Sequence, residues 1–232
     1  TKRINKITVK ELTDHIEINR GPFYLHYKDV FDLVESLENE LYDQGFQLVC
    51  GVDEAGRGPL AGPVVSAAVI MPKGYYLEGV TDSKKLSEKK RNQFEKLILE
   101  NAVSVSISFI DEKVIDEINI YEASRKAMIE AISNLKVKPD VVLVDAMPLN
   151  IEIETESIIK GDEKSFTIAC ASIIAKQARD RFMDELALKY PEYGFEKHKG
   201  YPTKQHKEAL KKYGILDIHR KTYKPVQEVL NK

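Results

Sequence analysis

The stretch "GVDEAGRGPLAGPVV" occupies residues 51–65 and joins a buried strand to a group of charges. Its apolar lead-in stops at two adjacent acids, Asp53 and Glu54, and a glycine–arginine–glycine turn follows at 56–58 before small and β-branched residues resume. Successive side chains on a regular strand point to opposite faces. The two acids can share one site only where the strand ends and the backbone turns. We therefore predict a strand over 46–54 that delivers carboxylates to a glycine turn.

The composition fits a globular protein made of one substantial domain and a small appendage. The chain has 232 residues, of which 43% are hydrophobic and 31% are charged. No apolar run approaches the ~20 residues of a membrane-spanning helix, and no signal peptide is visible, so we expect a cytoplasmic protein without a membrane partner. Cys50 and Cys170 lack metal-ligand spacing and are expected in the core. With a net charge of −2, binding to nucleic acid requires a local basic patch.

Hydrophobic periodicity divides most of the chain into strands and helices. Alternating or continuous apolar runs predict four strands, at 46–54, 62–71, 102–110 and 140–146. Capping residues and helical spacing predict helices from Ser87 through Glu100, after Asp111, from Tyr121 to Leu135 and from Phe166 to Tyr190. This order is typical of an α/β fold whose mixed sheet begins with a hairpin and gains a later strand through helices.

The first 47 residues are predicted to form a helical N-terminal extension. Apolar side chains recur there at helical spacing, at Val30, Leu33, Val34, Leu37 and Leu41. The alternative is a packed N-terminal helix with no activity of its own. We therefore divide the chain into an extension, 1–47, and a main domain, 48–232, whose last part, from about residue 191, consists of short helices and loops.

Two further acids occupy positions that suit a shared site. Asp145 lies at the end of the predicted strand at 140–146, and Asp162 follows a glycine just before the long helix. If this strand lies parallel to and beside the strand of Asp53, the acids meet at the carboxyl edge of the sheet, where open α/β sheets bind ligands. Gathered carboxylates repel one another unless cations neutralise them, and oxygen ligands favour Mg²⁺ or Mn²⁺. The alternatives are a turn residue at Asp145 and a helix cap at Asp162.

The segment at 197–224 combines basic and aromatic residues. The segment contains two acids, Glu208 and Asp217. Its basic residues are Lys197, Lys199, Lys204, Lys207, Lys211, Lys212, Arg220, Lys221 and Lys224. Tyrosines and three histidines, which lack a metal-ligand arrangement, are interspersed among them. Such a segment is typical of a surface that binds a nucleic-acid strand. The alternative is a solvated amphipathic helix, because several of these lysines share one helical face.

Six blocks in this order resemble a known family: "GVDEAGRGPLAGPVVSAAVI" (51–70), "DSKKLS" (82–87), "VDA" (144–146), "KGDEKSFTIACASIIAKQARD" (160–180), "HKGY" (198–201) and "IHR" (218–220). Over about residues 48–228 the chain is similar to type 2 ribonuclease H, the bacterial ribonuclease HII. Type 3 relatives usually carry "DESGKGD"-like residues where this chain has "DEAGRGP". Small departures, such as Cys170 in place of a common alanine and Pro202 after the tyrosine, affect none of the acids.

This resemblance implies a ribonuclease H-like fold with a central mixed five-stranded sheet flanked by helices, a helical C-terminal part and a short helical N-terminal extension. It also implies four catalytic, metal-binding acids, Asp53, Glu54, Asp145 and Asp162. The implied cofactors are two divalent cations, Mg²⁺ or Mn²⁺. Glu163 is adjacent to the motif but falls outside it, so the resemblance assigns no role to Glu163.

The resemblance also implies a set of contacts to the substrate. The expected substrate-binding residues are Gly56, Arg57, Gly58, Ser83, Lys84, Lys199 and Tyr201. The turn at 56–58 is similar to the family's sensor of a ribose 2′-OH, and Tyr201 matches a tyrosine that packs near the following nucleotide. Glycine permits a close approach that a Cβ would block, and the 2′-OH distinguishes RNA from DNA. Arg57 would contact a phosphate or hold the turn, and the alternative is that it pairs with a neighbouring acid.

The implied activity is endonucleolytic. It is hydrolysis of the RNA strand of RNA–DNA hybrids and cutting 5′ of ribonucleotides embedded in duplex DNA, a step of ribonucleotide excision repair. Two-metal catalysis would leave 3′-OH and 5′-phosphate ends. The expected partner is nucleic acid, and we expect a monomer. The residues leave two alternatives open, a metal-dependent resolvase-like nuclease and a non-catalytic nucleic-acid-binding module. The gathered acids argue against the binding module, because carboxylates repel phosphate unless metals intervene.

Overall fold

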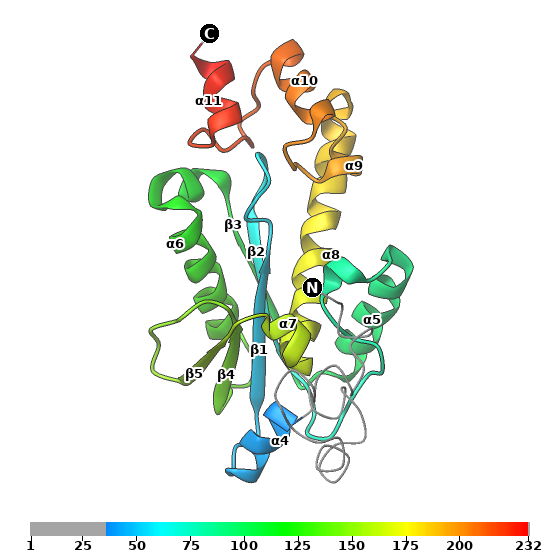
Figure 1. Cartoon of the computed structure of the whole chain (residues 1–232), viewed down its shortest axis with the longest axis vertical. Helices are drawn as coiled ribbons and strands as arrows, with labels where there is room; N and C mark the ends of the chain where they lie inside the picture. Colours follow the sequence, from blue (N-terminus) through cyan, green and yellow to red (C-terminus); the bar gives the residue numbers. More distant parts are fainter. Residues whose placement is uncertain (1–35, 232) are drawn as a thin grey trace, which may run out of the picture.

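The computed structural model describes residues 36–231 and is built around one five-stranded sheet (Figure 1). The spatial order of the strands is β3-β2-β1-β4-β5. The β1–β2 and β2–β3 pairs are antiparallel, whereas the β1–β4 and β4–β5 pairs are parallel. The strands are β1 (Val49–Ala55), β2 (Val64–Ile70), β3 (Ser104–Ile110), β4 (Val141–Asp145) and β5 (Glu154–Ile158). The predicted mixed sheet, which begins with a hairpin and continues through helices, is confirmed.

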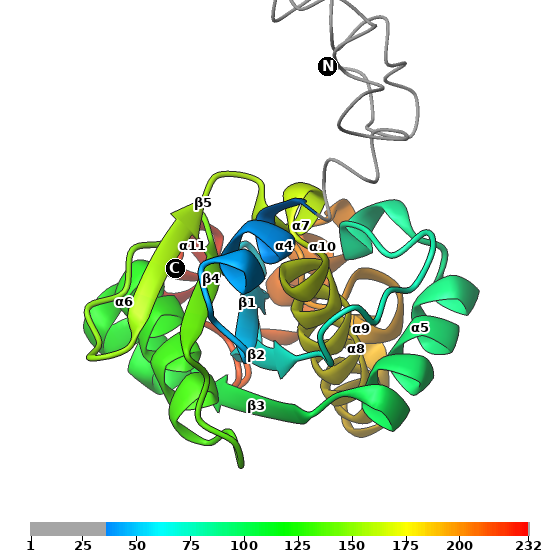
Figure 2. The ribbon, with the colours of Figure 1, turned by 90° about the horizontal axis from the view of Figure 1, so that it is seen from below.

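Helices cover both faces of this sheet (Figure 2). The long helix α8 (Phe166–Lys189) packs across β1 and β2, and α5 (Glu88–Asn101) packs beside it. The opposite face is covered by α6 (Glu112–Ser133). Burial on both faces explains the continuous apolar run of β4. Helix α8 approaches β1 closely because β1 carries a glycine at the contact: a Cβ on Gly51 would lie 2.0 Å from the backbone carbon of Thr167.

The helix starts follow the capping residues that the sequence predicts. The side chains of Ser87 and Asp111 accept hydrogen bonds from backbone N–H groups in the first turns of α5 and α6. Helix α6 is interrupted at Asn119, which has a φ of 70°. The Asn119 side chain accepts hydrogen bonds from the first backbone N–H groups of the following stretch. This interruption separates the two helical stretches that the sequence predicts.

The edge strand β5 is the element that the residue pattern fails to predict. Most of its side chains are exposed, and Glu154 and Glu156 are two of its five residues. It therefore lacks the alternation of apolar and polar residues that marks a half-buried strand. Its position depends on pairing with β4, which is information that a local pattern does not contain. The resemblance, in contrast, implied five strands.

The C-terminal part consists of short helices around a small core of its own. Besides these helices, α9 (Phe195–His198), α10 (Lys204–Tyr213) and α11 (Lys224–Leu230), the chain has the short helix α7 (Gly161–Lys164) and 3₁₀ turns at Ser83–Lys85 and Pro191–Tyr193. The three histidines of the 197–224 segment, His198, His206 and His219, are buried in this part. His206 Nε2 lies 3.1 Å from His219 Nε2. Burial lowers the pKa of His206 and of His219 to about 4. The ring nitrogens of His206 and His219 are engaged with each other and with the backbone at Tyr201 and Leu216, which is a structural role.

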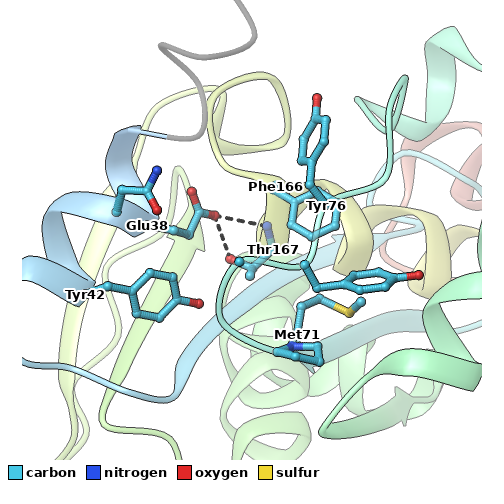
Figure 3. A pocket seen from close by; sticks show the side chains of 10 residues that line it. Glu38, Tyr42, Met71, Tyr76, Phe166 and Thr167 are labelled. Carbon is cyan, nitrogen blue, oxygen red and sulfur yellow. Dashed lines mark hydrogen bonds between the residues drawn. The ribbon is translucent and has the colours of Figure 1, made fainter. Parts of the chain in front are cut away.

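The described residues include only the last part of the predicted N-terminal extension. In this part, α4 (Ser36–Asp43) packs Leu41 and Tyr42 against the sheet, and Glu38 faces Thr167 at the start of α8 (Figure 3). The predicted apolar positions Val30, Leu33 and Val34 lie outside the described residues. The division of the chain at 47/48 stays a prediction. No helix within 36–231 has both the length and the hydropathy needed to cross a membrane.

Candidate active site

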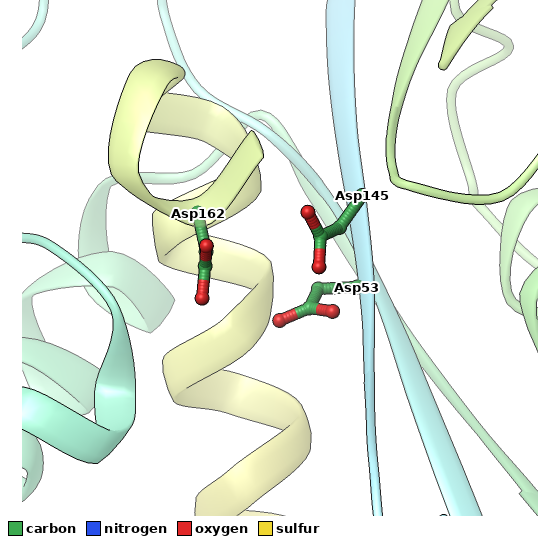
Figure 4. Close-up of side chains that lie close together, drawn as sticks. All are labelled: Asp53, Asp145 and Asp162. Carbon is green, nitrogen blue, oxygen red and sulfur yellow. The ribbon is translucent and has the colours of Figure 1, made fainter. Parts of the chain in front are cut away.

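Three carboxylates meet at one edge of the sheet. Strands β1 and β4 pair in parallel with Val52 opposite Val144, so the residues that follow, Asp53 and Asp145, lie side by side. Asp162 reaches them from α7, the short helix before α8 (Figure 4). Oxygen atoms of the three carboxylates lie within 4.8 Å of one another. The structure thus brings together three of the four acids that the sequence predicts as metal ligands.

The fourth predicted acid, Glu54, lies beside this group. Strand β1 does not end at the acids but continues through Ala55, which pairs with Val65 of β2. Neighbouring side chains on a continuing strand diverge, so Glu54 leaves the direction of Asp53. The predicted strand end at Glu54 is off by one residue, and the predicted turn follows at Gly56, which has a φ of 101°. Burial raises the pKa of Glu54, Arg57 lowers it, and the charge of Asp145 raises it further. Glu54 therefore remains within electrostatic reach of the three carboxylates.

The three-acid group places negative charge in a buried environment. Asp53 is only 3% exposed. Burial raises its pKa well above the usual range, and the charges of Glu54 and Asp145 add to this effect. Burial, together with the charges of Asp82 and Asp145, raises the pKa of Asp162 to about 7. A bound cation would relieve this repulsion. Because the donors are all carboxylate oxygens, the group fits a hard divalent cation.

A hollow of about 420 Å³ opens beside the acids. It is lined by Glu54, Ala55, Gly56, Arg57, Gly58, Ser83, Lys84, Asp145, Ser172, Lys176, Arg179 and Tyr201. The ring of Tyr201 lies directly beside the glycine turn in the lining of this hollow, because a Cβ on Gly58 would already be in van der Waals contact with Tyr201 Cε1, at 3.4 Å. The structure therefore brings the predicted ribose-sensing turn and the predicted nucleotide-packing tyrosine into one hollow with the acids.

The other predicted substrate-binding residues occupy different situations. Ser83 is buried, and its hydroxyl lies 2.9 Å from that of Ser172. Lys84 lies among the acids. Burial lowers its pKa, but the negative charges of Asp53 and Asp82 help to outweigh burial, so the pKa of Lys84 is raised. The side chain of Lys199 pairs instead with Asp184 in an adjacent hollow.

Arg57 is half-exposed, and its Nη1 lies 3.6 Å from Glu54 Oε1. In this structure it therefore takes the alternative that the sequence left open, pairing with a neighbouring acid. An ion pair at this distance and exposure is weak. The guanidinium consequently remains available for a phosphate that enters the hollow.

Two buried arginines hold the glycine turn from behind. Arg220, which the sequence predicts as part of a basic surface, is 0% exposed, so this prediction is wrong for Arg220. Its guanidinium donates hydrogen bonds to the carbonyl oxygens of Gly56, Arg57 and Gly62. Arg220 is buried because it supplies hydrogen-bond donors to these loop carbonyl oxygens, and buried carbonyl groups need such partners.

The second buried arginine, Arg179, was missed by the sequence reasoning. It donates to the carbonyl oxygens of Ala61, Pro63 and Lys199. The position of Arg179 also explains why the first residue of the turn is a glycine. Gly56 has a φ of 101°, and a Cβ there would lie 2.2 Å from Arg179 Nε. The turn therefore packs directly on a fixed guanidinium.

One face of α8 adds further residues that the sequence reasoning missed. Ser172, Lys176 and Arg179 all line the hollow, and their spacing of four and three residues places them on one side of a helix. The available signal was the recurrence of polar residues at this spacing inside a helix rich in small apolar residues. A charge on the buried face of a helix marks a candidate functional position.

The pH dependence of stability is expected to reveal the repulsion among these acids. Because the pKa of Asp162 is raised to about 7, the folded state binds a proton that the unfolded state has lost, from about pH 4 upward. Stability is therefore lost as pH rises through this window. In metal-free buffer, Asp162→Asn should melt above the parent, with the largest gain above about pH 7 and a shrinking gain towards about pH 4. Calorimetric melting of both proteins across this range measures it, and a gain that is absent or independent of pH would contradict the assignment.

The same hollow and acids fall in a region that matches known proteins. A family model described as "Ribonuclease HII" matches residues 50–226. A "Ribonuclease HII" of Bacillus cytotoxicus is 52% identical over 203 residues, which is 88% of this chain and 78% of that protein. A "Ribonuclease HII" of Bacillus mycoides is 50% identical over 205 residues, covering 88% of this chain and 80% of that protein.

A solved structure has the same fold. The crystal structure of the ribonuclease H2 from Pyrococcus horikoshii OT3 superposes with a TM-score of 0.69 at 29% sequence identity. The match covers 79% of this chain and 97% of that chain. The acids, the glycine turn and the tyrosine lie within residues 50–226, which the family model matches.

Proposed function

The chain belongs to the ribonuclease HII family and is a ribonuclease H endonuclease, and we propose that it cuts the RNA strand of RNA–DNA hybrids and the 5′ side of ribonucleotides embedded in duplex DNA. The observation that carries this proposal is the meeting of Asp53, Asp145 and Asp162 within 4.8 Å, beside a hollow where Gly58 faces Tyr201. Acids alone would repel a nucleic acid, whereas acids that hold divalent cations attract its phosphates.

In the proposed mechanism, Asp53, Asp145, Asp162 and Glu54 would hold two divalent cations, Mg²⁺ or Mn²⁺. When bound, such a pair supplies an activated water and stabilises the leaving oxygen of an in-line displacement. The products are then a 3′-OH and a 5′-phosphate. Lys84, which lies among the acids, is placed to contact a phosphate oxygen. Its positive charge would also limit the repulsion between the acids and the backbone.

The remaining residues of the hollow select the sugar. The peptide groups of the turn at 56–58 can donate to and accept from a ribose 2′-OH. Arg179 and Arg220 occupy carbonyl oxygens on the inner side of the loop, so the turn keeps a fixed shape when the sugar arrives. Tyr201 lies next to Gly58, and its half-exposed ring can pack against the next sugar. Together they test two successive nucleotides.

A panel of duplexes tests the proposal. The protein is incubated with a DNA duplex carrying one ribonucleotide, with an RNA–DNA hybrid and with a four-way DNA junction, each with Mg²⁺ and with EDTA. We expect Mg²⁺-dependent cutting of the first two and no cutting of the junction. Binding without cutting, or cutting of the junction, would contradict the proposed function.

The exposed basic residues are expected to contact phosphates outside the hollow. Lys221 is exposed, whereas Lys199 pairs with Asp184 in the free protein. Because each neutralised phosphate contributes roughly −0.9 to the slope of log K against log salt, Lys221→Ala should lower affinity and make this slope shallower by up to about 0.9. Lys199→Ala should act in the same direction with a smaller effect. Both variants should still turn over.

Fluorescence anisotropy of a labelled hybrid over a salt series measures these slopes. The matched control is Lys138→Ala, because Lys138 is exposed and precedes Val141, the first residue of β4, whereas Asp145 is the last residue of that strand. If the slopes of both test variants equal that of the control, the C-terminal lysines are a solvated surface only.

A further inference from the structure

Glu38 of α4 connects the N-terminal extension to the start of the long helix. Its Oε1 accepts hydrogen bonds from Ser165 Oγ at 2.7 Å, Thr167 N at 3.1 Å and Thr167 Oγ1 at 3.0 Å. The partners are 127 and 129 residues away along the chain. Glu38 is 5% exposed, although it lies on a short surface helix. A single carboxylate oxygen therefore fixes the first turn of α8 (Figure 3).

The other carboxylate oxygen of Glu38 is buried and has no hydrogen-bond partner among residues 36–231. Burying an unpaired carboxylate oxygen destabilises a protein. Where a protein keeps an unfavourable local arrangement, the compensation commonly lies in the function of a nearby site. Here the nearby site is the group of acids.

The first turn of α8 lies between Glu38 and the strand that carries Asp53. On its inner side, Gly51 of β1 packs against the Thr167 backbone, where even a Cβ would not fit. Gly51 is two residues from Asp53. On its N-terminal side, α8 continues from α7, which carries Asp162, through the cap residue Ser165. This turn thus connects the helix that carries Asp162 to the strand that carries Asp53.

We propose that Glu38 is a positioning residue for the metal-binding acids: it holds the first turn of α8 against β1 and thereby fixes the separation of Asp53 and Asp162 that divalent cations require. The inference rests on the proposed function, which takes these acids as metal ligands. Glu38 lies outside the region, 50–226, that the family model matches. The described part of the extension therefore contributes to the catalytic site without touching it.

Three variants separate positioning from general stability. Glu38→Ala removes the acceptor of all three hydrogen bonds. Glu38→Gln keeps one acceptor oxygen for the same donors and should rescue. Leu41→Ala is the matched control, because Leu41 packs α4 against the sheet without contacting Ser165 or Thr167 through a hydrogen bond.

The readouts are Mn²⁺ binding by calorimetry, at a temperature well below each melting point, and the Mn²⁺ concentration that gives half-maximal cleavage. We expect Glu38→Ala to weaken Mn²⁺ binding about 10-fold, at the lower end of losses seen when groups that orient metal ligands are removed. Glu38→Gln and Leu41→Ala should stay within about twofold of the parent. If Glu38→Ala fails to fold, Thr167→Val, which removes one of the three donors, should weaken Mn²⁺ binding in the same direction by about threefold.

Two results would overturn the inference. One is a Glu38→Ala protein, or in its absence Thr167→Val, that binds Mn²⁺ as tightly as the parent. The other is an equal loss in Leu41→Ala, which would show that any loosening of α4 has this effect. A parent protein that binds no Mn²⁺ would overturn the proposed function and the inference together. If the parent binds Mn²⁺ and cleaves, and Glu38→Ala (or Thr167→Val in its absence) binds Mn²⁺ as tightly as the parent, only the positioning role is overturned.

Discussion

Replacing Asp53 or Asp145 with asparagine should lower cleavage of a ribonucleotide-containing duplex by about 10³-fold or more, because each change removes one charge from a group that must hold divalent cations. Asparagine keeps the shape of the side chain, so the fold should survive. For Asp53→Asn, melting in metal-free buffer should occur at a higher temperature than for the parent, since the pKa of Asp53 is raised by burial and by its acidic neighbours.

Single-turnover cleavage at saturating Mg²⁺ measures the first effect, and calorimetric melting in EDTA measures the second. The matched control is Glu163→Gln, because Glu163 is adjacent to Asp162 but pairs with Lys85 outside the three-acid group. The control should cleave within a few-fold of the parent. An Asp145→Asn protein that cuts as fast as the parent would refute the metal-site assignment.

The second large effect is expected at Tyr201, which is 42% exposed and lies beside Gly58 in the lining of the hollow. Tyr201→Ala removes the ring that would pack on the nucleotide after the ribose. Stacking of this kind contributes about 1–3 kcal/mol, so cleavage at a single ribonucleotide in DNA should slow by about 5- to 150-fold. Tyr201→Phe keeps the ring and should lose little. An all-RNA strand should be affected less, because a 2′-OH on the next sugar crowds the ring.

The matched control for this prediction is Tyr213→Ala, because Tyr213 has a similar exposure of 47% and lies on α10 away from the hollow. Single-turnover cleavage of a one-ribonucleotide duplex and of an all-RNA strand paired with DNA gives the two rates. Equal rates for Tyr201→Ala and the parent on both substrates would mean that Tyr201 only packs in the structure. The proposal that the glycine turn and Tyr201 recognise two successive nucleotides would then be wrong.

The parts of the fold that the sequence predicts are those with a local cause. Strand β4 is covered on both faces and therefore reads as a continuous apolar run. Ser87 and Asp111 cap helices through their own side chains. The meeting of Asp53 and Asp145 follows from one further assumption, that their strands are parallel neighbours, and the pairing of β1 with β4 confirms it.

The parts that the sequence does not predict depend on distant contacts. Strand β5 has almost no buried face, so its residues carry no strand pattern. Arg220 belongs to a basic segment, and arginine is usually exposed, yet the loop carbonyls at Gly56 and Gly62 draw it into the interior. Glu38 resembles any acid on an amphipathic helix until its partners at Ser165 and Thr167 are known. Each of these placements requires the assembled fold.

The central claim is that the gathered acids use divalent cations to direct water at the phosphate beside a ribose. The most direct test is the chemistry of the product ends from a labelled DNA duplex with one ribonucleotide, cleaved in Mg²⁺ and analysed by mass spectrometry. We expect one cut, 5′ of the ribonucleotide, with a 3′-OH on one fragment and a 5′-phosphate on the other, and no cut in EDTA. A 2′,3′-cyclic phosphate end, which arises when the ribose 2′-OH itself attacks, or cutting that persists in EDTA, would contradict the account.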